Sequence, residues 1–290
     1  MRYAAELLPY HDAELDTALG ELAGLGFDEV MLWSSAPPLA DHVGPGDDVA
    51  VIRRTLGRHG MRATGLTCYG RDRHELTARL RLAHDLGVDT LVFDCEAPYP
   101  EFVEHWLAPM LDEAERLGVR IAVENHLTVP FSADFESGAG EDQRWSEGVD
   151  SLAQIRRLVT ELDHPNLGIC LAPPHLWVMG ESISEAVWFL AERGKLFHYY
   201  LWDVDRAYRR GVDGLDFGPG ERQLPRPDGV LDHAVGLAAL HRVAYTGAAS
   251  LKCHGTAGWP VEKVTRELRR ADTHLRTCFA RAGIAPLRRT

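Results

Sequence analysis

The stretch LGVRIAVENH, residues 117–126, joins the end of a helical pattern to an apolar run that stops abruptly in polar side chains. Gly118 follows the helical pattern, at a position where glycine readily takes the left-handed conformation that ends a helix. The run IAV at 121–123 is apolar throughout, which is typical of a strand covered on both faces in a parallel sheet. Glu124 then opens the polar segment ENH. This stretch therefore predicts one helix–glycine–strand unit of an α/β protein.

The same unit recurs along the chain, with a glycine between a helical pattern and an apolar run. Gly26 precedes EVMLW, Gly60 precedes ATGLT and Gly87 precedes TLVFD. Units of this kind at intervals of roughly 30 residues are typical of a β/α array. Counting onward predicts eight parallel strands, at residues 3–8, 28–34, 62–68, 89–95, 119–125, 167–172, 196–202 and 248–253.

The fold class that this array predicts is a (β/α)8 TIM barrel, occupying residues 1–290 as a single domain. Such barrels need about 250 residues, and no Pro/Ser-rich linker divides the chain. A doubly wound open sheet is the rival topology, and it calls for a Gly-rich phosphate-binding turn after the first strand. The first strand runs instead into LPYH at 8–11. The barrel is therefore the favoured fold.

Composition narrows the classes of partner. The chain carries 43 acidic and 31 basic side chains, a net charge of −12, which argues against binding to a nucleic-acid backbone. It contains no run of about 18 apolar residues that could cross a membrane. Its first residues lack the pattern of a signal peptide, so we expect a cytoplasmic protein. The cysteine count of five is odd and no CxxC occurs, so neither a disulfide framework nor a zinc ribbon is expected.

Polar residues gather where the predicted strands end, which is where the strands of a TIM barrel build the active site. Glu6 lies near the end of the first predicted strand, Trp33 and two serines lie at the end of the second, and Glu96 follows the fourth. The two longest irregular stretches, 126–148 and 204–229, also follow predicted strands. A small-molecule substrate bound at this end of the barrel is therefore the expected partner. The predicted helix around 260–282 is a candidate surface for packing against a second copy of the chain.

Four segments resemble the sugar isomerase/epimerase superfamily of xylose isomerase-like TIM barrels. They are IAVENH at 121–126, NLGICLAPPH at 166–175, HYYLWD at 198–203 and ASLK at 249–252. They occur in the order of the fifth to eighth strands of that family. The resemblance implies the barrel fold and an isomerase, epimerase or lyase as the class of enzyme.

The resemblance also implies a divalent cation held by Glu, Asp, His and Glu at the ends of these four strands. Glu124 retains the first ligand, but Ala172, Tyr200 and Lys252 stand at the other three positions. Alanine offers no ligand atom, and an ammonium repels a cation. We therefore expect the usual metal site to be absent and no cofactor to be required. Lys252 is expected to pair with Glu124 across the barrel.

The candidate site combines these residues with others at the strand ends. The predicted catalytic residues are Glu124, His175, Lys252 and Tyr200, and the predicted substrate-binding residues are Arg206, Asp203, Trp202, Glu96, His126, His254 and Trp33. Several of these residues have a purely structural alternative. Lys252 and Glu124 could form a salt bridge that fills a lost site, His175 could be a solvent-facing loop residue, and Arg206 an ordinary surface arginine. A shifted metal site built from Glu124 and the histidines 126, 175 and 254 is a further alternative.

Three functions follow from these residues. The first is a metal-independent enzyme that transfers protons on a small sugar-like or carbonyl-containing metabolite, with Lys252 as electrophilic stabiliser, general base or Schiff-base amine. The second is a non-catalytic or partner-dependent barrel subunit. The third is a metal-dependent hydrolase or an enzyme similar to endonuclease IV, which the acidic charge and the missing ligands oppose.

Overall fold

Glycines lie between several helices and the strands that follow them, as the repeated helix–glycine–strand unit predicts. In the computed structural model, which describes residues 1–35, 42–70, 72–95, 99–126, 148–206 and 219–284, Gly26, Gly60, Gly87 and Gly118 all have positive φ, between 64° and 83°. A side chain at these positions would strain the backbone. Polar side chains begin several of the helices: Asp72, Ser151 and Ser182 each accept a hydrogen bond from the backbone N–H three residues on.

Eight parallel strands close into a barrel in the order of the sequence, and each lies within two residues of its predicted range. The strands are β1 (Arg2–Glu6), β2 (Glu29–Ser35), β3 (Arg62–Tyr69), β4 (Thr90–Phe93), β5 (Arg120–Glu124), β6 (Leu167–Leu171), β7 (Leu196–Leu201) and β8 (Ala248–Leu251). The barrel closes where Arg2 to Ala5 of β1 pair with Ala248 to Leu251 of β8. The (β/α)8 prediction is confirmed, and the open-sheet alternative is wrong because no strand edge is left unpaired among these eight.

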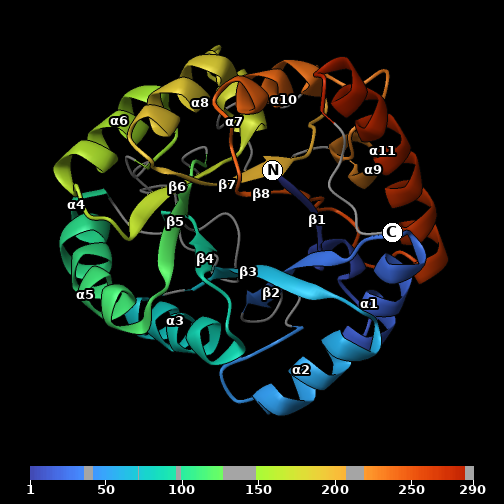
Figure 1. The fold of residues 1–290 in the computed structure, drawn as a ribbon, viewed down its shortest axis with the longest axis horizontal. Helices are drawn as coiled ribbons and strands as arrows, with labels where there is room; N and C mark the ends of the chain where they lie inside the picture. The colour runs from blue at the N-terminus through green and yellow to red at the C-terminus, as the bar shows by residue number, and fades with distance from the viewer. Residues whose placement is uncertain (36–41, 71, 96–98, 127–147, 207–218, 285–290) are drawn as a thin grey trace, which may run out of the picture.

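The helices form a ring outside the barrel (Figure 1). They are α1 (Leu15–Gly24), α2 (Val49–Arg58), α3 (Arg73–Leu86), α4 (Tyr99–Glu101), α5 (Ala108–Leu117), α6 (Leu152–Glu161), α7 (Pro173–Val178), α8 (Ile183–Glu192), α9 (Gly220–Gln223), α10 (His233–Arg242) and α11 (Val261–Arg281), with a 3-10 turn η1 (Leu8–Tyr10) and a π-helical turn η2 (Phe102–Leu107). The predicted helix around 260–282 is thus α11.

Two apolar cores result from the alternation of side chains along each strand. The larger core packs the outward faces of the strands against the helices. The smaller one fills the inside of the barrel and includes Met31, Val92, Ala122 and Tyr200. All five cysteines are free thiols, and only Cys95 is not fully buried.

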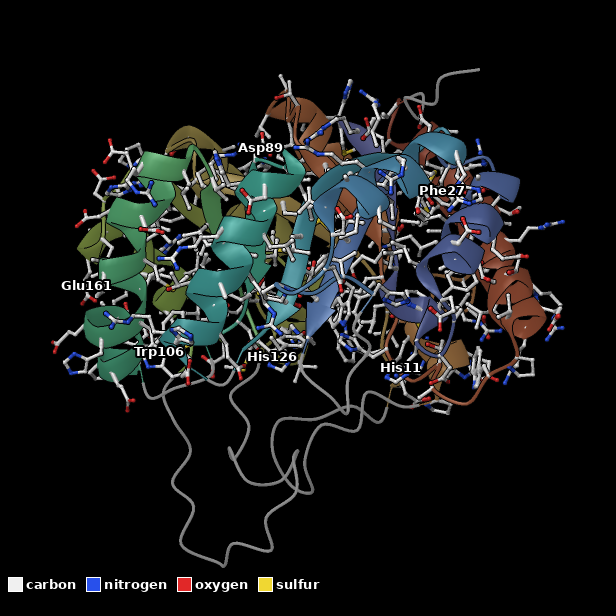
Figure 2. All side chains as sticks on the ribbon, turned by 90° about the horizontal axis from the view of Figure 1, so that it is seen from below. His11, Phe27, Asp89, Trp106, His126 and Glu161 are labelled. Carbon is white, nitrogen blue, oxygen red and sulfur yellow. The ribbon has the colours of Figure 1, made fainter. Side chains whose placement is uncertain are left out.

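The two ends of the barrel are chemically different. Figure 2 shows Phe27 and Asp89, which precede β2 and β4, at the upper end, and His11 and His126, which follow β1 and β5, at the lower end. The lower end is therefore the carboxyl end of the strands. The predicted site residues that the structure describes lie at this end, whereas Glu96, residues 127–147 of the first long irregular stretch and residues 207–218 of the second lie outside the described residues.

Candidate functional site

Hydrogen bonds cross the inside of the barrel between strands that are not neighbours. Thr67 of β3 bonds to Glu6 of β1 and to Tyr200 of β7, and Lys252, directly after β8, bonds to Glu124 of β5. Side chains of non-adjacent strands can meet only in the barrel interior. All five are fully buried. They form one polar layer, which we call the inner polar layer.

The centre of the inner polar layer is an ion pair between Lys252 and Glu124. The Nζ of Lys252 donates to both carboxylate oxygens of Glu124, at 3.1 and 3.0 Å. The expected pairing of these two residues is confirmed. Burial raises the pKa of the Glu124 carboxyl, and the ammonium beside it opposes that rise. The pKa of Lys252 is raised above its usual value because the carboxylates of Glu124 and Glu6 outweigh the effect of burial, so the lysine is an ammonium at neutral pH.

Aromatic rings surround the ammonium of Lys252. Its Nζ lies 3.9 Å from the ring centroid of Tyr200, 5.8 Å from that of Trp33 and 5.9 Å from that of Tyr69. Rings at such distances stabilise a desolvated cation through their negative faces. The Tyr200 hydroxyl lies 2.9 Å from Thr67 Oγ1, and burial raises the pKa of Tyr200 well above its usual value. Tyr200 is therefore a neutral phenol whose ring faces the ammonium.

Glu6 is a member of the inner polar layer that sequence reasoning noted at a strand end but did not include in the site. Its Oε1 accepts a hydrogen bond of 3.0 Å from Thr67, while its buried Oε2 has no hydrogen-bond partner among the described residues. Burial, reinforced by the charge of Glu124, raises its pKa to about 7 against the opposing effect of Lys252. The available signal was the alternation of β1, which places Glu6 on the inward face opposite to that of Tyr3 and Ala5.

Histidine and tryptophan side chains line the barrel beyond the inner polar layer. The His126 and His175 ring centroids are 4.3 Å apart, His175 lies 5.2 Å from Trp202, and Trp202 lies 5.5 Å from His254. Trp33 completes this group at 6.4 Å from His254. His126 and His254 are partly exposed, and Figure 2 shows His126 at the lower rim. This set, which we call the rim group, joins five of the predicted site residues.

Two of the rim histidines, His175 and His254, are neutral at neutral pH. Burial and the nearby ammonium of Lys252 lower the pKa of both His175 and His254 well below the usual value. His175 is fully buried on the short helix α7, so the alternative of a solvent-facing loop residue is wrong. The indole Nε1 of Trp33 is buried without a hydrogen-bond partner among the described residues. The rim group thus places aromatic faces and neutral polar groups near the ammonium of Lys252.

Two predicted substrate-binding residues lie apart from the inner polar layer. The Asp203 carboxylate accepts hydrogen bonds from the backbone N–H groups of Val204, Val230 and Leu231. Burial raises its pKa to about 6 despite these bonds. The structure thus gives Asp203 an anchoring contact to residues 230–231. Arg206 is exposed, and its charge acts on Asp203.

A divalent cation does not fit the residues at the positions where the resemblance places its ligands. Both oxygens of Glu124 face Lys252, the side chain of Ala172 has no donor atom, and the Tyr200 hydroxyl is bonded to Thr67. Across the described ranges, no three His, Cys, Asp or Glu side chains are arranged to hold a metal ion. The alternative of a shifted site built from Glu124 and the histidines 126, 175 and 254 stays a prediction from the sequence.

A closed parallel barrel with polar residues at the carboxyl ends of its strands defines a (β/α)8 protein. Residues 19–278 match the xylose isomerase-like TIM barrel family, and the chain belongs to that family. The resemblance of the four sequence segments is thereby confirmed at the level of the family.

Solved structures share this fold at low sequence identity. The chain is similar to L-ribulose 3-epimerase, with a TM-score of 0.68 and 14% identity over 97% of this chain and 95% of that one. It is also similar to D-psicose 3-epimerase from Clostridium cellulolyticum H10, with a TM-score of 0.65 and 15% identity over 95% and 98%. A third is the probable 3-DHS dehydratase of petrobactin synthesis from Bacillus anthracis, with a TM-score of 0.62 and 14% identity over 93% and 98%.

One similarity by sequence covers only a part of each protein. The chain is 31% identical over 107 residues to the human actin maturation protease, which is 32% of this chain and 30% of that protein. The matched part is thus about a third of that protein, and it carries no assignment of activity.

No helix in the described part of the chain is long and apolar enough to cross a membrane.

Proposed function

We propose that this chain is an isomerase, epimerase or lyase that transfers protons on a small sugar-like or carbonyl-containing metabolite, without a divalent cation at the position usual for the family resemblance. The observation that carries the proposal is the ion pair of Lys252 and Glu124 at the carboxyl end of the barrel, where both side chains are fully buried. A fixed positive charge in a site that excludes water stabilises the negative charge that develops on a carbonyl oxygen.

The protonation state of Lys252 favours one of the three roles that the sequence left open, which were electrophilic stabiliser, general base and Schiff-base amine. A Schiff-base amine or a general base must be neutral, whereas the pKa of Lys252 is raised by the carboxylates beside it. The proposal therefore assigns Lys252 the role of electrophile. It places the substrate carbonyl at the ammonium and one face of the substrate against the rings of the rim group.

The printed names of the structural relatives support the class of reaction. Two of those described above are epimerases and one is a dehydratase. Epimerisation and dehydration next to a carbonyl share one step, which is removal of a proton from carbon to give an enolate. That step needs a base and a stabiliser of the oxyanion, and buried ionisable groups beside an ammonium supply both kinds of chemistry.

The test is exchange of carbon-bound hydrogen with solvent. Purified protein, treated with EDTA and analysed for metals by mass spectrometry, is incubated in D2O with D-fructose, D-allulose, D-tagatose or L-ribulose, and exchange is followed by proton NMR. The proposal expects exchange without stoichiometric metal, and a loss of at least about 100-fold in Lys252→Met. A stoichiometric metal, or full activity without Lys252, would overturn it.

Lys195 offers a matched control for this test. It is also a buried lysine beside an acid, with Nζ 3.2 Å from Asp163 and 2.7 Å from the His164 carbonyl. It lies just before β7, at the opposite end of the barrel, so Lys195→Met is expected to keep the exchange activity.

A second candidate is the non-catalytic or partner-dependent barrel, and one observation favours it. The Lys252–Glu124 pair is fully buried, as a salt bridge that only fills the barrel would be. The same exchange experiment separates the two, because a barrel without chemistry leaves all four ketoses unlabelled.

A further inference from the structure

Glu6 is a second buried carboxyl in the inner polar layer, and it takes no part in the ion pair of Lys252 and Glu124. It ends β1, it is fully buried, and its hydrogen bond from Thr67 passes across the barrel interior. A buried carboxyl oxygen without a hydrogen-bond partner costs free energy, and a catalytic role is one explanation for such a group in a native protein. The unpartnered Oε2 of Glu6 is an atom of this kind.

The direction of the hydrogen bonds fixes where a proton can reside. Thr67 donates its hydroxyl hydrogen to Glu6 Oε1, so the Tyr200 hydroxyl must be the donor in the 2.9 Å contact with Thr67 Oγ1. The chain of donors therefore runs from Tyr200 through Thr67 to Oε1. With the donors in this direction, a proton on the Glu6 carboxyl resides on Oε2, which accepts no hydrogen bond of normal geometry from the described residues.

Charge balance separates the two carboxyls of the inner polar layer. The layer holds one ammonium, and both oxygens of Glu124 accept hydrogen bonds from it. Burial raises the pKa of Glu6 to about 7, against the charge of Lys252 and the hydroxyls of Thr67 and Tyr200, which lower it, so both protonation states of Glu6 are populated near neutral pH. A general acid or base works best when its pKa lies near the working pH. By this criterion Glu6 is suited to proton exchange, and Glu124 to holding the ammonium.

We propose that Glu6, and not Glu124, is the catalytic residue that exchanges a proton with the substrate, through Oε2, while Lys252 holds the oxyanion and Thr67 and Tyr200 act as positioning residues. This inference rests on the proposed function and names the acid–base group within it.

The step balances without a further reactant. The Glu6 carboxylate takes the proton from the carbon next to the substrate carbonyl, and the electron pair of that C–H bond forms a carbon–carbon double bond. The π pair of the carbonyl moves to its oxygen, whose negative charge lies against the Lys252 ammonium. Protonated Glu6 then returns the proton to the same carbon, the carbonyl re-forms, and in D2O the returned nucleus is deuterium. Isomerisation, epimerisation and dehydration all begin with this half-reaction.

The test compares two isosteric substitutions, Glu6→Gln and Glu124→Gln, in the D2O exchange of the four ketoses. Glu6→Gln is expected to slow exchange by at least about 100-fold, the usual contribution of a general acid–base group. Glu6→Asp is expected to recover part of the rate. Glu29→Gln is the matched control, because Glu29 is a buried strand glutamate that pairs with Arg62 at the amino end of β2.

A spectroscopic measurement follows the carboxyl without any substrate. Infrared spectra of the protein between pH 5 and 9 are expected to show a protonated carboxyl band that titrates near pH 7, is absent from Glu6→Gln and persists in Glu29→Gln. Asp203, whose pKa is raised to about 6, also contributes a band, so the assignment is read from the difference between wild type and Glu6→Gln, and the absence of a band titrating near pH 7 from that difference would overturn it.

The outcomes distinguish this inference from the proposed function. Exchange by wild type that Glu6→Gln retains within about twofold, while Glu124→Gln abolishes it, would assign the proton to Glu124 and leave the proposed function standing. No exchange by wild type with any of the four ketoses would overturn the proposed function and, with it, the role of Glu6.

Discussion

The ammonium of Lys252 and the carboxylate of Glu124 are joined by two hydrogen bonds of 3.1 and 3.0 Å inside a closed barrel, and neither side chain contacts solvent. The two residues are 128 positions apart in the sequence. Each charge is tolerated in the interior because the other is present. The cost of removing one partner is therefore very different from the cost of removing both.

Lys252→Met is expected to lower the free energy of unfolding by about 3–5 kcal/mol, because it leaves the Glu124 charge buried without a counter-ion. The double variant Lys252→Met/Glu124→Leu is expected to lie within about 1–2 kcal/mol of wild type. Urea unfolding of both variants at pH 7 measures the difference. Equal destabilisation of the single and double variants would contradict a mutually dependent pair.

Glu6 is expected to make the protein less stable as the pH rises. Its pKa is about 7 in the folded protein against 4.5 for an ordinary glutamate carboxyl, so the folded state binds more protons between these values. The stability contributed by the protonated group is complete below pH 4.5 and is lost as the pH rises through 7, a change of about 3 kcal/mol. Glu6→Gln lacks this loss. Unfolding of both proteins from pH 4.5 to 8 should show curves that separate with pH, and parallel curves would contradict the raised pKa.

The barrel could be predicted from the sequence because its signals are local. Each helix-ending glycine and each apolar run determines the conformation of the backbone close to it in the sequence. Gly87 and Gly118 do take the predicted left-handed conformation. The family segments similarly placed Glu124 and Lys252 at strand ends where they meet. The pairing needed no distance information, since two opposite charges in one dry interior must compensate each other.

Other parts of the site depend on relationships that one sequence does not contain. Glu6 ends the first strand, but its role depends on Thr67 reaching it from β3 and on the protonation state that burial imposes. Asp203 follows a strand as a site residue would, yet its carboxylate is turned toward the backbone of residues 230–231. Strand-end position indicates that a side chain lies near the site, whereas its partners are decided by tertiary packing.

Thr67→Val is expected to shift the pH dependence of ketose exchange upward. The Thr67 hydroxyl donates to the Glu6 carboxylate and so favours its charged form; removing this donor raises the pKa of Glu6 further above 7. A hydrogen bond to a charged group corresponds to about one to two pH units here. The midpoint is read from exchange rates between pH 5.5 and 9. Thr64→Val, which removes a buried hydroxyl bonded to the Val30 carbonyl, is the control and should leave the midpoint in place.

Divalent cations are expected to leave the thermal stability of the EDTA-treated protein unchanged. A ligand that binds the folded state at a concentration of 100 times its Kd adds about 2.7 kcal/mol to the free energy of unfolding. With Glu124 bonded to Lys252 and Ala172 at a ligand position, Mn²⁺ and Mg²⁺ find no ligand set there. Thermal melts with and without each cation measure this, and a saturable rise in Tm would contradict it.

Asp203→Ala is expected to loosen the segment that follows α9 without removing a group that contacts the reacting atoms. The carboxylate accepts backbone hydrogen bonds from Val204, Val230 and Leu231, so its loss leaves these buried or partly buried donors without that acceptor, at a cost of about 1–3 kcal/mol. Hydrogen exchange should quicken at the amides of residues 230 and 231. Asp205→Ala, two residues on at a partly exposed position, is the control and should leave those amides protected. If Asp203→Ala raises KM for a ketose and leaves amide protection unchanged, Asp203 is a substrate-binding residue, as its place after a strand predicts.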